Sequence, residues 1–369
     1  MRRSFYLFLI LLCQINTLVI VLHAQPARTQ DSLALVELYN ATGGPNWTYD
    51  NTEYYDNRID ETRNVPNAGN SWNFNVPISN WHGVELNAEG CVVGLILQVS
   101  NLNGQLPDIN LPNLQYLNCI GNKLIGSIPD LSNLTNLQYL DCSSNQLTGS
   151  IPNFSNLPNL QYLDCSSNQL TGSIPNFSNL PNLQYFNCSL NELTGSLPDF
   201  SNLPDLQVLY CGSNQLSGSI PDFSDLPNLE AFWCSLNDLS GSIPDFSNLP
   251  SLENFNSDFN QLTGNIPNFS NSPDLLSFRC SENELTGEIP DFTNLPNLER
   301  FDCNNNELTG SIPDFTNLPN LQRFDCSNNE LTGSIPDFTS LPDLERFNCY
   351  NNELTGKYPD RIKLSINVH

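Results

Sequence analysis

A pattern of hydrophobic and polar positions repeats along most of the chain at a nearly constant spacing. One copy, from Leu160 to Pro175, reads LQYLDCSSNQLTGSIP. The glycine of this pattern recurs at positions 104, 126, 149, 172, 195, 218, 241, 264, 287, 310, 333 and 356, and the spacing is constant from position 126 onward. A fixed period of about 23 residues is typical of a solenoid in which every coil is one repeat.

Alternating positions within the repeat predict a β-sheet. Counted from the first leucine of a repeat, positions 4 and 6 are one strand period apart, so their side chains point to the same side. Position 4 is Leu or Phe in eleven copies, and position 6 is Cys in ten of them, with Ser257 as the exception. A phenylalanine column on the return leg runs from Phe154 to Phe338. These columns are the expected core, because a single repeat can bury its apolar face only against its neighbours.

An asparagine occupies position 9 in eleven successive copies, from Asn122 to Asn352. A buried amide must be hydrogen-bonded, and an asparagine side chain offers donors and an acceptor to the backbone of its own turn and of the next coil. Proline after Ile or Leu, followed by Leu-Pro-Asn-Leu, excludes a long helix on the return leg. We therefore expect extended and 3₁₀ segments there.

The pattern L-x-x-L-x-C-x-x-N-x-L-x-G-x-I-P resembles the leucine-rich repeat of the plant-type subclass, which carries the L-x-G-x-I-P tail. The resemblance covers roughly Val92 to Pro359, and cysteine stands where a third leucine is usual. It implies an α/β-class solenoid: a right-handed curved horseshoe with a parallel β-sheet on the concave face, extended and 3₁₀ segments on the convex face, and little helix. It also implies that the asparagine column forms the structural ladder of this family, at Asn145, Asn168, Asn191, Asn214, Asn237, Asn260 and Asn283.

The chain divides into four segments. Residues 1–24 are typical of a signal peptide, with a charged start, an apolar stretch and a plausible cleavage site after Ala24. Polar residues interrupt the apolar stretch, which disfavours a membrane helix, and lipoprotein processing lacks the small residue expected before Cys13. Residues 25–91 are the expected amino-terminal cap with a loop inserted at 49–70, residues 92–359 hold twelve repeats, and residues 360–369 alternate as a carboxy-terminal capping strand.

The cap has its own signals. Residues 31–40 predict a short helix with Asp31 or Ser32 as its N-cap. The segment is similar to the cap that precedes plant-type repeats in plant receptor ectodomains and in secreted bacterial repeat proteins, although of the paired cap cysteines only Cys91 is present. The cap style and the junction after Ala24 resemble those of bacterial proteins. We expect the cap tryptophans to be core residues.

Charge and cysteine content limit the possible partners. With 13 Lys and Arg against 39 Asp and Glu, the formal charge is −26, which disfavours nucleic acid and anionic membranes. An aspartate that recurs after the proline allows a calcium site or a merely solvated acidic surface, but no D-x-D-x-D-G loop is present. Ten cysteines share one inward column, where parallel Cβ vectors suit disulfides poorly, so we expect reduced thiols. We expect no metal, no cofactor and no membrane span after signal cleavage.

Three groups of outward-facing residues on the strands are candidates for partner binding. An aromatic row at position 3 includes Tyr162 and Tyr185, and an arginine row at the same position comprises Arg300, Arg323 and Arg346. Between them the repeat departs from its own consensus at Leu190, Tyr210, Trp233, Leu236, Phe259 and Arg279. An exposed apolar patch with Tyr, Trp and Arg often marks a binding site, and the alternative is drift at surface positions.

The two rows also have alternative interpretations. The arginines either bind carboxylates of a partner or an acidic sugar, or form solvated ion pairs with Asp302 and Asp325. The tyrosines either stack on sugar rings or fill a cross-strand ladder. In the core, Ser257 and Ser272 replace a Cys and a Leu of the same coil, which predicts a hydrogen bond between them or a trapped water, and a locally weak coil.

We expect a non-catalytic extracellular recognition module that binds a protein or peptide on its concave face. A surface polysaccharide-binding or ice-binding protein is the second hypothesis, and a purely structural cell-surface protein is the third. An enzyme is disfavoured, because His82 is the only internal histidine of the mature chain and the regular carboxylates follow the repeat. The predicted location is secreted or at the cell surface, and the predicted state is a monomer.

Overall fold

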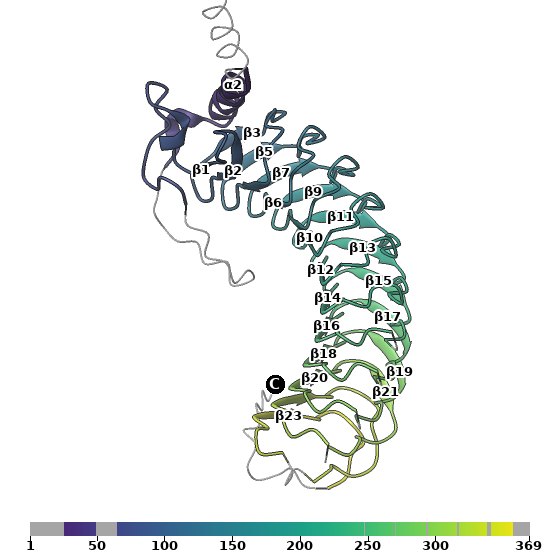
Figure 1. Cartoon of the computed structure of the whole chain (residues 1–369). Helices are drawn as coiled ribbons and strands as arrows, with labels where there is room; N and C mark the ends of the chain where they lie inside the picture. The colour runs from purple at the N-terminus through teal and green to yellow at the C-terminus, as the bar shows by residue number, and fades with distance from the viewer. Residues whose placement is uncertain are drawn as a thin grey trace, which may run out of the picture.

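The computed structural model describes residues 26–48 and 65–356, except residues 247, 270, 293, 316 and 338–340. The predicted signal peptide, the predicted terminal strand, residues 49–64 of the predicted loop and Phe338 lie outside these described residues. The chain forms a curved solenoid whose concave side is lined by one long sheet (Figure 1). The architecture is therefore the predicted leucine-rich-repeat horseshoe with little helix.

Thirteen strands form the concave sheet. In spatial order they are β1 (Val84–Leu86), β2 (Val92–Ile96), β4 (Tyr116–Asn118), β6 (Tyr139–Asp141), β8 (Tyr162–Asp164), β10 (Tyr185–Asn187), β12 (Val208–Tyr210), β14 (Ala231–Trp233), β16 (Asn254–Asn256), β18 (Ser277–Arg279), β20 (Arg300–Asp302), β22 (Arg323–Asp325) and β23 (Arg346–Asn348). The β1–β2 pair is antiparallel and every later pair is parallel, one strand per repeat. Equivalent repeat positions lie directly opposite each other; Tyr162, for example, faces Tyr139 and Tyr185.

A second sheet of ten strands lies farther from the concave side (Figure 1). It comprises β3 (Asn103–Gln105), β5 (Lys123–Gly126), β7 (Gln146–Gly149), β9 (Gln169–Gly172), β11 (Glu192–Gly195), β13 (Gln215–Gly218), β15 (Asp238–Gly241), β17 (Gln261–Asn265), β19 (Glu284–Glu288) and β21 (Glu307–Thr309). From β5 onward each strand contains the Leu of its repeat, which points inward while its neighbours are largely exposed. The sequence predicts extended chain here but not the pairing of these segments into a sheet.

The return leg contains single turns. Leu157 donates its N–H to the carbonyl of Phe154, and Leu160 donates to Leu157, both at 3.0 Å. The same pair of bonds recurs in later coils. The first turn ends after one hydrogen bond because the next residue, Pro158, has no N–H to donate. After the second turn, Gln161 donates its N–H to the carbonyl of Gln138 in the neighbouring coil. In the described part of the chain, the 3₁₀ helices η1 (Gly44–Asn46) and η2 (Ile78–Asn80) both lie in the cap.

The core between the sheets consists of the predicted columns. The position 4 and position 6 side chains of the described coils are buried, and their phenylalanines stack along the solenoid; Phe255 and Phe278 have ring centroids 5.0 Å apart. Phenylalanines of the return leg meet them edge-on, as Phe223 meets Phe232 at 4.8 Å. Every cysteine among the described residues is a free thiol, and burial raises the pKa of the column thiols, such as Cys211.

The asparagine column connects neighbouring coils. Asn168 accepts the N–H of Leu147 at 2.9 Å and donates to the carbonyls of Cys142, Cys165 and Ser166 at 3.1–3.2 Å. Asn145, Asn191, Asn214, Asn237, Asn260 and Asn283 repeat this arrangement. Each side chain thereby satisfies backbone groups that no strand ladder reaches.

The cap begins with a longer helix than expected. α2 spans Pro26–Ala41, so Asp31 lies inside the helix and not at its N-cap. Its buried carboxylate instead accepts the N–H of Val92, the first residue of β2, at 2.9 Å. No helix in the described ranges is long and apolar enough to span a bilayer. The tryptophans Trp47, Trp72 and Trp81 are buried, with neighbouring ring centroids 4.8 Å and 5.0 Å apart.

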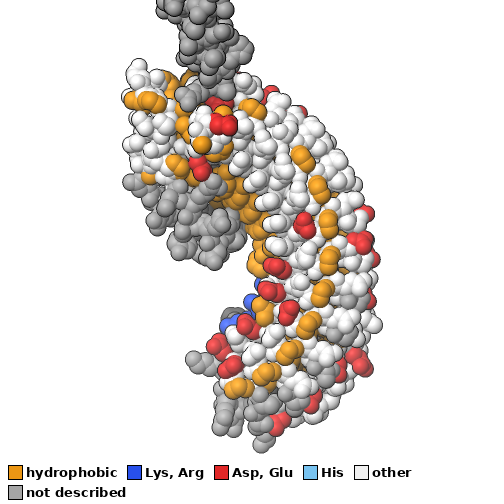
Figure 2. All heavy atoms as spheres, in the orientation of Figure 1, with side chains coloured by type: hydrophobic (Ala, Val, Ile, Leu, Met, Phe, Trp, Pro, Cys, Tyr) orange, Lys and Arg blue, Asp and Glu red, His pale blue; other side chains and the backbone are white. Residues whose placement is uncertain are grey.

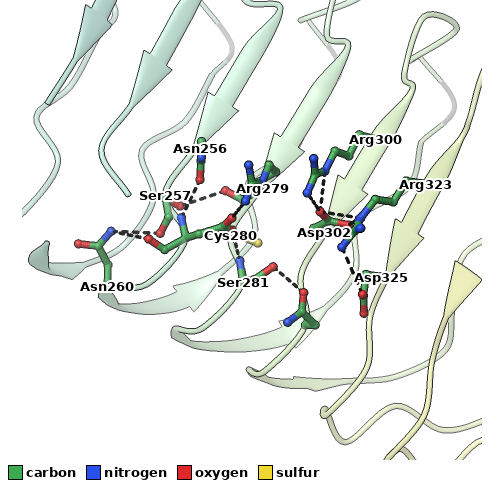
Figure 3. Close-up of polar contacts among 12 residues, drawn as sticks. Asn256, Ser257, Asn260, Arg279, Cys280, Ser281, Arg300, Asp302, Arg323 and Asp325 are labelled. Carbon is green, nitrogen blue, oxygen red and sulfur yellow. Dashed lines mark hydrogen bonds and ion pairs between the residues drawn. The ribbon is translucent and has the colours of Figure 1, made fainter. Parts of the chain in front are cut away.

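The coil that contains β16 differs from our expectation. Ser257 and Ser272 are fully buried but do not bond each other. Ser257 Oγ donates to the carbonyl of Arg279 at 3.4 Å (Figure 3). Ser272 Oγ donates to the carbonyl of Phe246, also at 3.4 Å. The prediction of a mutual hydrogen bond was therefore wrong: each hydroxyl bonds a different neighbouring coil.

Candidate functional site

The concave sheet carries two chemically different regions. Hydrophobic side chains gather along its amino-terminal part, and basic side chains gather farther along the same face (Figure 2). Among the described residues from 65 to 356, Arg279, Arg300, Arg323 and Arg346 lie on this face, and Lys123 is the one Lys or Arg that lies elsewhere. For a chain with a formal charge of −26, this is a marked segregation of charge.

The aromatic region is a continuous row of rings. Tyr116, Tyr139, Tyr162 and Tyr185 stack with centroid distances of 4.1, 4.3 and 4.3 Å and nearly parallel planes. Tyr210 then meets Tyr185 edge-on at 6.0 Å and stacks on Trp233 at 4.5 Å. Since adjacent tyrosines cover each other's faces, the row presents ring edges to a partner. Sugar stacking on the tyrosine faces is therefore disfavoured, and the cross-strand ladder describes them better.

Tyr162 lies in the middle of this row. It is only 9% exposed, and its hydroxyl is buried without a hydrogen-bond partner. Burial, followed by the nearby Tyr139 and Asp164, raises the pKa of its phenol far above the usual range. Tyr162 therefore remains neutral at physiological pH.

Trp233 ends the row and is the exposed tryptophan of the chain. It is 42% exposed, whereas the three cap tryptophans are at most 6% exposed. One indole face is covered by Tyr210. On the other side the next residue of the same column is Asn256, which is shorter and 8% exposed. No described aromatic ring covers that second face.

Three further apolar residues lie at the edge of the concave sheet. Leu190, Leu236 and Phe259 are 51–57% exposed, and each has a φ of 57–58°. Gly121, Ser144, Asn305 and their equivalents share this left-handed conformation at position 8. A left-handed conformation is unusual for bulky residues, whereas Gly and Asn adopt it readily. These three side chains thus lack both burial and a favourable backbone, so the fold itself does not explain them.

The sequence marks these three residues as departures from the consensus repeat. We did not predict their left-handed backbone conformation from it. A signal was present, because most other copies place Gly, Ser or Asn at position 8, and Gly and Asn favour a positive φ.

The arginine region is largely paired with buried aspartates (Figure 3). Arg300 Nε donates to Asp302 at 2.6 Å, and Arg323 Nε reaches across to the same carboxylate at 2.8 Å. Arg323 also lies 3.5 Å from Asp325. The ion-pair interpretation therefore accounts for Arg300 and Arg323, with Asp302 bridging both in a cross-strand contact that simple same-strand pairing does not predict.

Arg279 has a different environment. It is ion-paired through Nη2 with Asp258, while its Nε is buried and makes no hydrogen bond. Burial raises the pKa of Asp258, and the Arg279 charge opposes this shift. We did not predict the ion pair between Arg279 and Asp258 from the sequence. Arg346 is exposed and has no ion pair among the described residues.

A hollow of about 890 Å³ accompanies the arginines. Its lining comprises Asn254, Leu276, Ser277, Glu299, Arg300, Gln322, Arg323, Leu344, Glu345 and Arg346. Most of these side chains are polar, and the charged ones are two glutamates and three arginines. The carboxy-terminal half of the concave face is thus a polar, nearly charge-balanced surface.

The recurrent aspartates after proline have a structural role. Asp130, Asp199 and Asp222 each accept the N–H of the serine two residues later at 2.9 Å. These are Asx turns, which give these three aspartates a structural role. Within the described ranges, no three His, Cys, Asp or Glu side chains are arranged to hold a metal.

The internal histidine lies in the cap. His82 is 1% exposed and accepts the N–H of Gly69 through Nδ1 at 3.3 Å. Burial lowers its pKa, so it is neutral at pH 7. The position suits a structural role, because a proton on Nδ1 would remove this acceptor.

Comparison with known proteins agrees with this architecture. Models described as leucine-rich repeats (two copies) match residues 135–179, 158–202, 181–226 and 319–357, and a single leucine-rich-repeat model matches residues 297–318. No curated protein matches the chain.

Three solved structures are informative. A plant peptide hormone receptor, RGFR1 in complex with RGF2, is 34% identical, with a TM-score of 0.62 over 69% of this chain and 46% of that one. The Arabidopsis receptor kinase HAESA ectodomain, in complex with an IDA peptide hormone ligand, is 29% identical, with a TM-score of 0.65 over 90% and 59%. A plant ice-binding protein is 27% identical, with a TM-score of 0.60 over 90% and 97%.

The chain spans about half the length of the receptor structures that it matches. Its repeats match the leucine-rich-repeat models, and its solenoid is similar in fold to the receptor structures. The protein is a leucine-rich-repeat protein whose solenoid is similar to the ectodomains of plant peptide receptors.

Proposed function

We propose that this protein is a non-catalytic extracellular recognition module, secreted or held at the cell surface, that binds a protein or peptide on the concave face of its solenoid. The observation that carries the proposal is the apolar patch midway along that face, in which Trp233 and the edge residues Leu190, Leu236 and Phe259 are exposed and Tyr210 is half-buried. A few residues supply most of the binding energy at protein interfaces, and Trp and Tyr are enriched among them.

The backbone conformation supports the same site. Leu236 and Phe259 occupy left-handed positions at which Asn or Gly would be more stable. Retaining a bulky apolar side chain at such a position, while half of it remains in water, disfavours the free protein. A partner that covers these side chains offsets that cost. The receptors RGFR1 and HAESA, which bind peptide hormones according to their structures, share the solenoid and support a peptide or protein ligand.

The test is capture of a partner from the surface and culture fractions of the source organism. The wild-type protein is compared with the double variant Tyr210→Ala/Trp233→Ala. Phe74→Ala is the matched control, because Phe74 is an aromatic side chain of similar exposure, 52%, in the cap. We expect the control to retain the partner and the double variant to lose it.

Retention of the partner by the double variant contradicts a site at the central patch. In that case, Tyr162→Ala/Tyr185→Ala and Arg323→Gln/Arg346→Gln test the two ends of the same face. Capture of a partner that none of these variants affects would reject the concave face altogether.

Sedimentation of the free protein tests the proposed monomeric state.

Ice binding is a second candidate, supported by one observation. The second sheet exposes a column of hydroxyl residues at regular spacing, including Thr148, Thr171, Thr194, Thr263 and Thr286. The plant ice-binding protein shares the solenoid over nearly all of its own length. Ice-crystal shaping by the wild type that is lost in Thr171→Lys/Thr194→Lys, with Trp233→Ala unaffected, would favour this candidate over the first.

A further inference from the structure

We propose that the gap between Trp233 and Arg279 is an anchor subsite for one aromatic side chain of an extended peptide. The inference rests on the proposed function and specifies the chemistry of the partner. In this subsite the open face of the Trp233 indole stacks on the partner's ring, and the Arg279 guanidinium contacts that ring from the other side.

The gap follows from the register of three parallel strands. Trp233 in β14 faces Asn256 in β16, and Asn256 faces Arg279 in β18. Adjacent strands lie about 4.8 Å apart, so the backbones of Trp233 and Arg279, two strands apart in the same column, are separated by about 10 Å. The Arg279 side chain reaches back toward Asp258 of the β16 coil, so its guanidinium lies closer to the gap than its backbone does. Tyr210 covers one face of the indole, and the nearly buried Asn256 forms the floor beside the other face. A ring stacked at an offset geometry fits this width.

Arg279 provides the opposite side of the subsite. Its side chain is 33% exposed, and only its Nη2 is paired, with Asp258. Its Nε and the Tyr162 hydroxyl are the buried side-chain polar atoms without a partner in the described ranges. A guanidinium over an aromatic ring gains a cation–π interaction.

The polar groups of the gap favour an aromatic ring over a sugar. A sugar needs several free hydrogen-bonding groups around the stacked face. Asn256 already accepts the N–H of Asp258 through its Oδ1 at 3.0 Å, and Asp258 already accepts both Arg279 and the N–H of Ser281. The apolar neighbours Leu236 and Phe259 are exposed on the same coils. Few polar groups remain to recognise hydroxyls, whereas apolar contacts are available.

The charge of the concave face also limits the chemistry of the expected partner. Arg279, Arg300 and Arg323 are each paired with a buried aspartate, and Glu299 and Glu345 line the hollow beside them. The arginine region is thus nearly neutral overall. We therefore expect an aromatic anchor within a polar segment of mixed charge, not a strongly acidic ligand.

Fluorine NMR of protein labelled with 5-fluorotryptophan tests the subsite directly. The chain contains four tryptophans, and three are buried in the cap, so one resonance, assigned with Trp233→Phe, reports the gap. The probes are N-acetylphenylalanine amide, N-acetylleucine amide and cellotetraose, each titrated into the full-length protein. We expect only the phenylalanine probe to shift the Trp233 resonance saturably in the millimolar range.

Arg279→Gln should weaken binding of the phenylalanine probe about 2–5-fold, as expected for loss of a cation–π contact of about 0.5–1 kcal/mol. Arg279→Lys should retain part of that binding, and Arg346→Gln serves as a charge-matched control without effect. Equal binding of the leucine probe, stronger binding of cellotetraose, or no saturation with any probe would each overturn the proposal. Unchanged affinity of Arg279→Gln would do the same.

The two proposals can fail separately. A captured partner that binds Trp233→Phe and Arg279→Gln like the wild type, but loses affinity in Leu236→Asn/Phe259→Asn, rejects the anchor and leaves the proposed function intact. Saturable binding of the phenylalanine probe in a protein that captures no partner supports the anchor and counts against the proposed function.

Discussion

The substitution Ser272→Leu should stabilise the solenoid. Ser272 is fully buried in the coil of β16, at a position where nine other coils bury a leucine to 1% exposure or less: Leu111, Leu134, Leu157, Leu180, Leu203, Leu226, Leu249, Leu295 and Leu318. Leucine in place of serine adds three carbon atoms, worth about 0.8 kcal/mol each when buried. The lost hydroxyl makes one long bond to the Phe246 carbonyl, at 3.4 Å, worth about 0.5–1 kcal/mol. We expect a net gain of about 1.5–2 kcal/mol in the free energy of unfolding.

Urea denaturation measures the gain in stability, and hydrogen exchange shows which strands it affects. Amides of β16 and of the flanking strands β14 and β18 should exchange more slowly in the variant, and those of β4 should not change. Leu249→Ser in the preceding coil is the reciprocal control. It should lose about 3–5 kcal/mol, in the range measured when a buried leucine is truncated and leaves a cavity.

A neutral or destabilising effect of Ser272→Leu, together with the expected loss for Leu249→Ser, would refute this reasoning. It would mean that the neighbouring coils have already closed over the serine, so that the added carbons are overpacked. The same hydrogen-exchange experiment on the wild type tests whether the coil of β16 is the weakest, as the sequence predicts. Since Asp258 and Phe259 belong to this coil, a weak coil would also make the centre of the concave face adaptable.

Individual contacts give four further predictions. Asn168→Ala should lose about 3 kcal/mol or more in urea denaturation, because four backbone groups lose their partner; Asn168→Asp, which keeps only the acceptor, should not restore stability. Leu236→Asn should raise stability by about 1 kcal/mol, because asparagine tolerates its φ of 58°, while partner capture weakens; a loss of stability would contradict the strain argument. Asp31→Asn should be more stable than the wild type at pH 7: burial raises the Asp31 pKa above 3.8, so the ionised carboxylate opposes folding at neutral pH, and the advantage should vanish as pH falls through that raised pKa. In a thiol titration of the native protein truncated before Gln25, only Cys91 should react rapidly, and denaturant should expose the remaining thiols; fewer thiols after denaturation would indicate disulfides.

The sequence predicted the orientation of the candidate site residues but not the contacts that they make. The outward orientation of the tyrosine and arginine rows followed from strand periodicity, because alternate side chains must face opposite sides. Their interactions did not follow from it. The distance between Tyr139 and Tyr162, which closes the tyrosine faces to a sugar, depends on the register and curvature of neighbouring strands. The reach of Arg323 to Asp302 is likewise a contact between neighbouring strands of different repeats.

The sequence by itself determined the repeat unit of this protein. A constant period, with inward Leu, Phe and Cys and a recurrent Asn, has one physical solution, a stack of coils that share a core and bond their turns through the asparagines. Each coil contacts only its neighbours, so local pattern is sufficient to define this part of the fold.

Only the tertiary structure decided what depends on relations between coils and on backbone conformation. It paired the Leu-x-Gly segments into a second sheet, placed Leu236 and Phe259 in left-handed conformations, and left one face of Trp233 open opposite Arg279. Side chains in register across a sheet lie about 4.8 Å apart although they are a whole repeat apart in sequence, so their stacking and pairing are determined by the curvature of the whole solenoid.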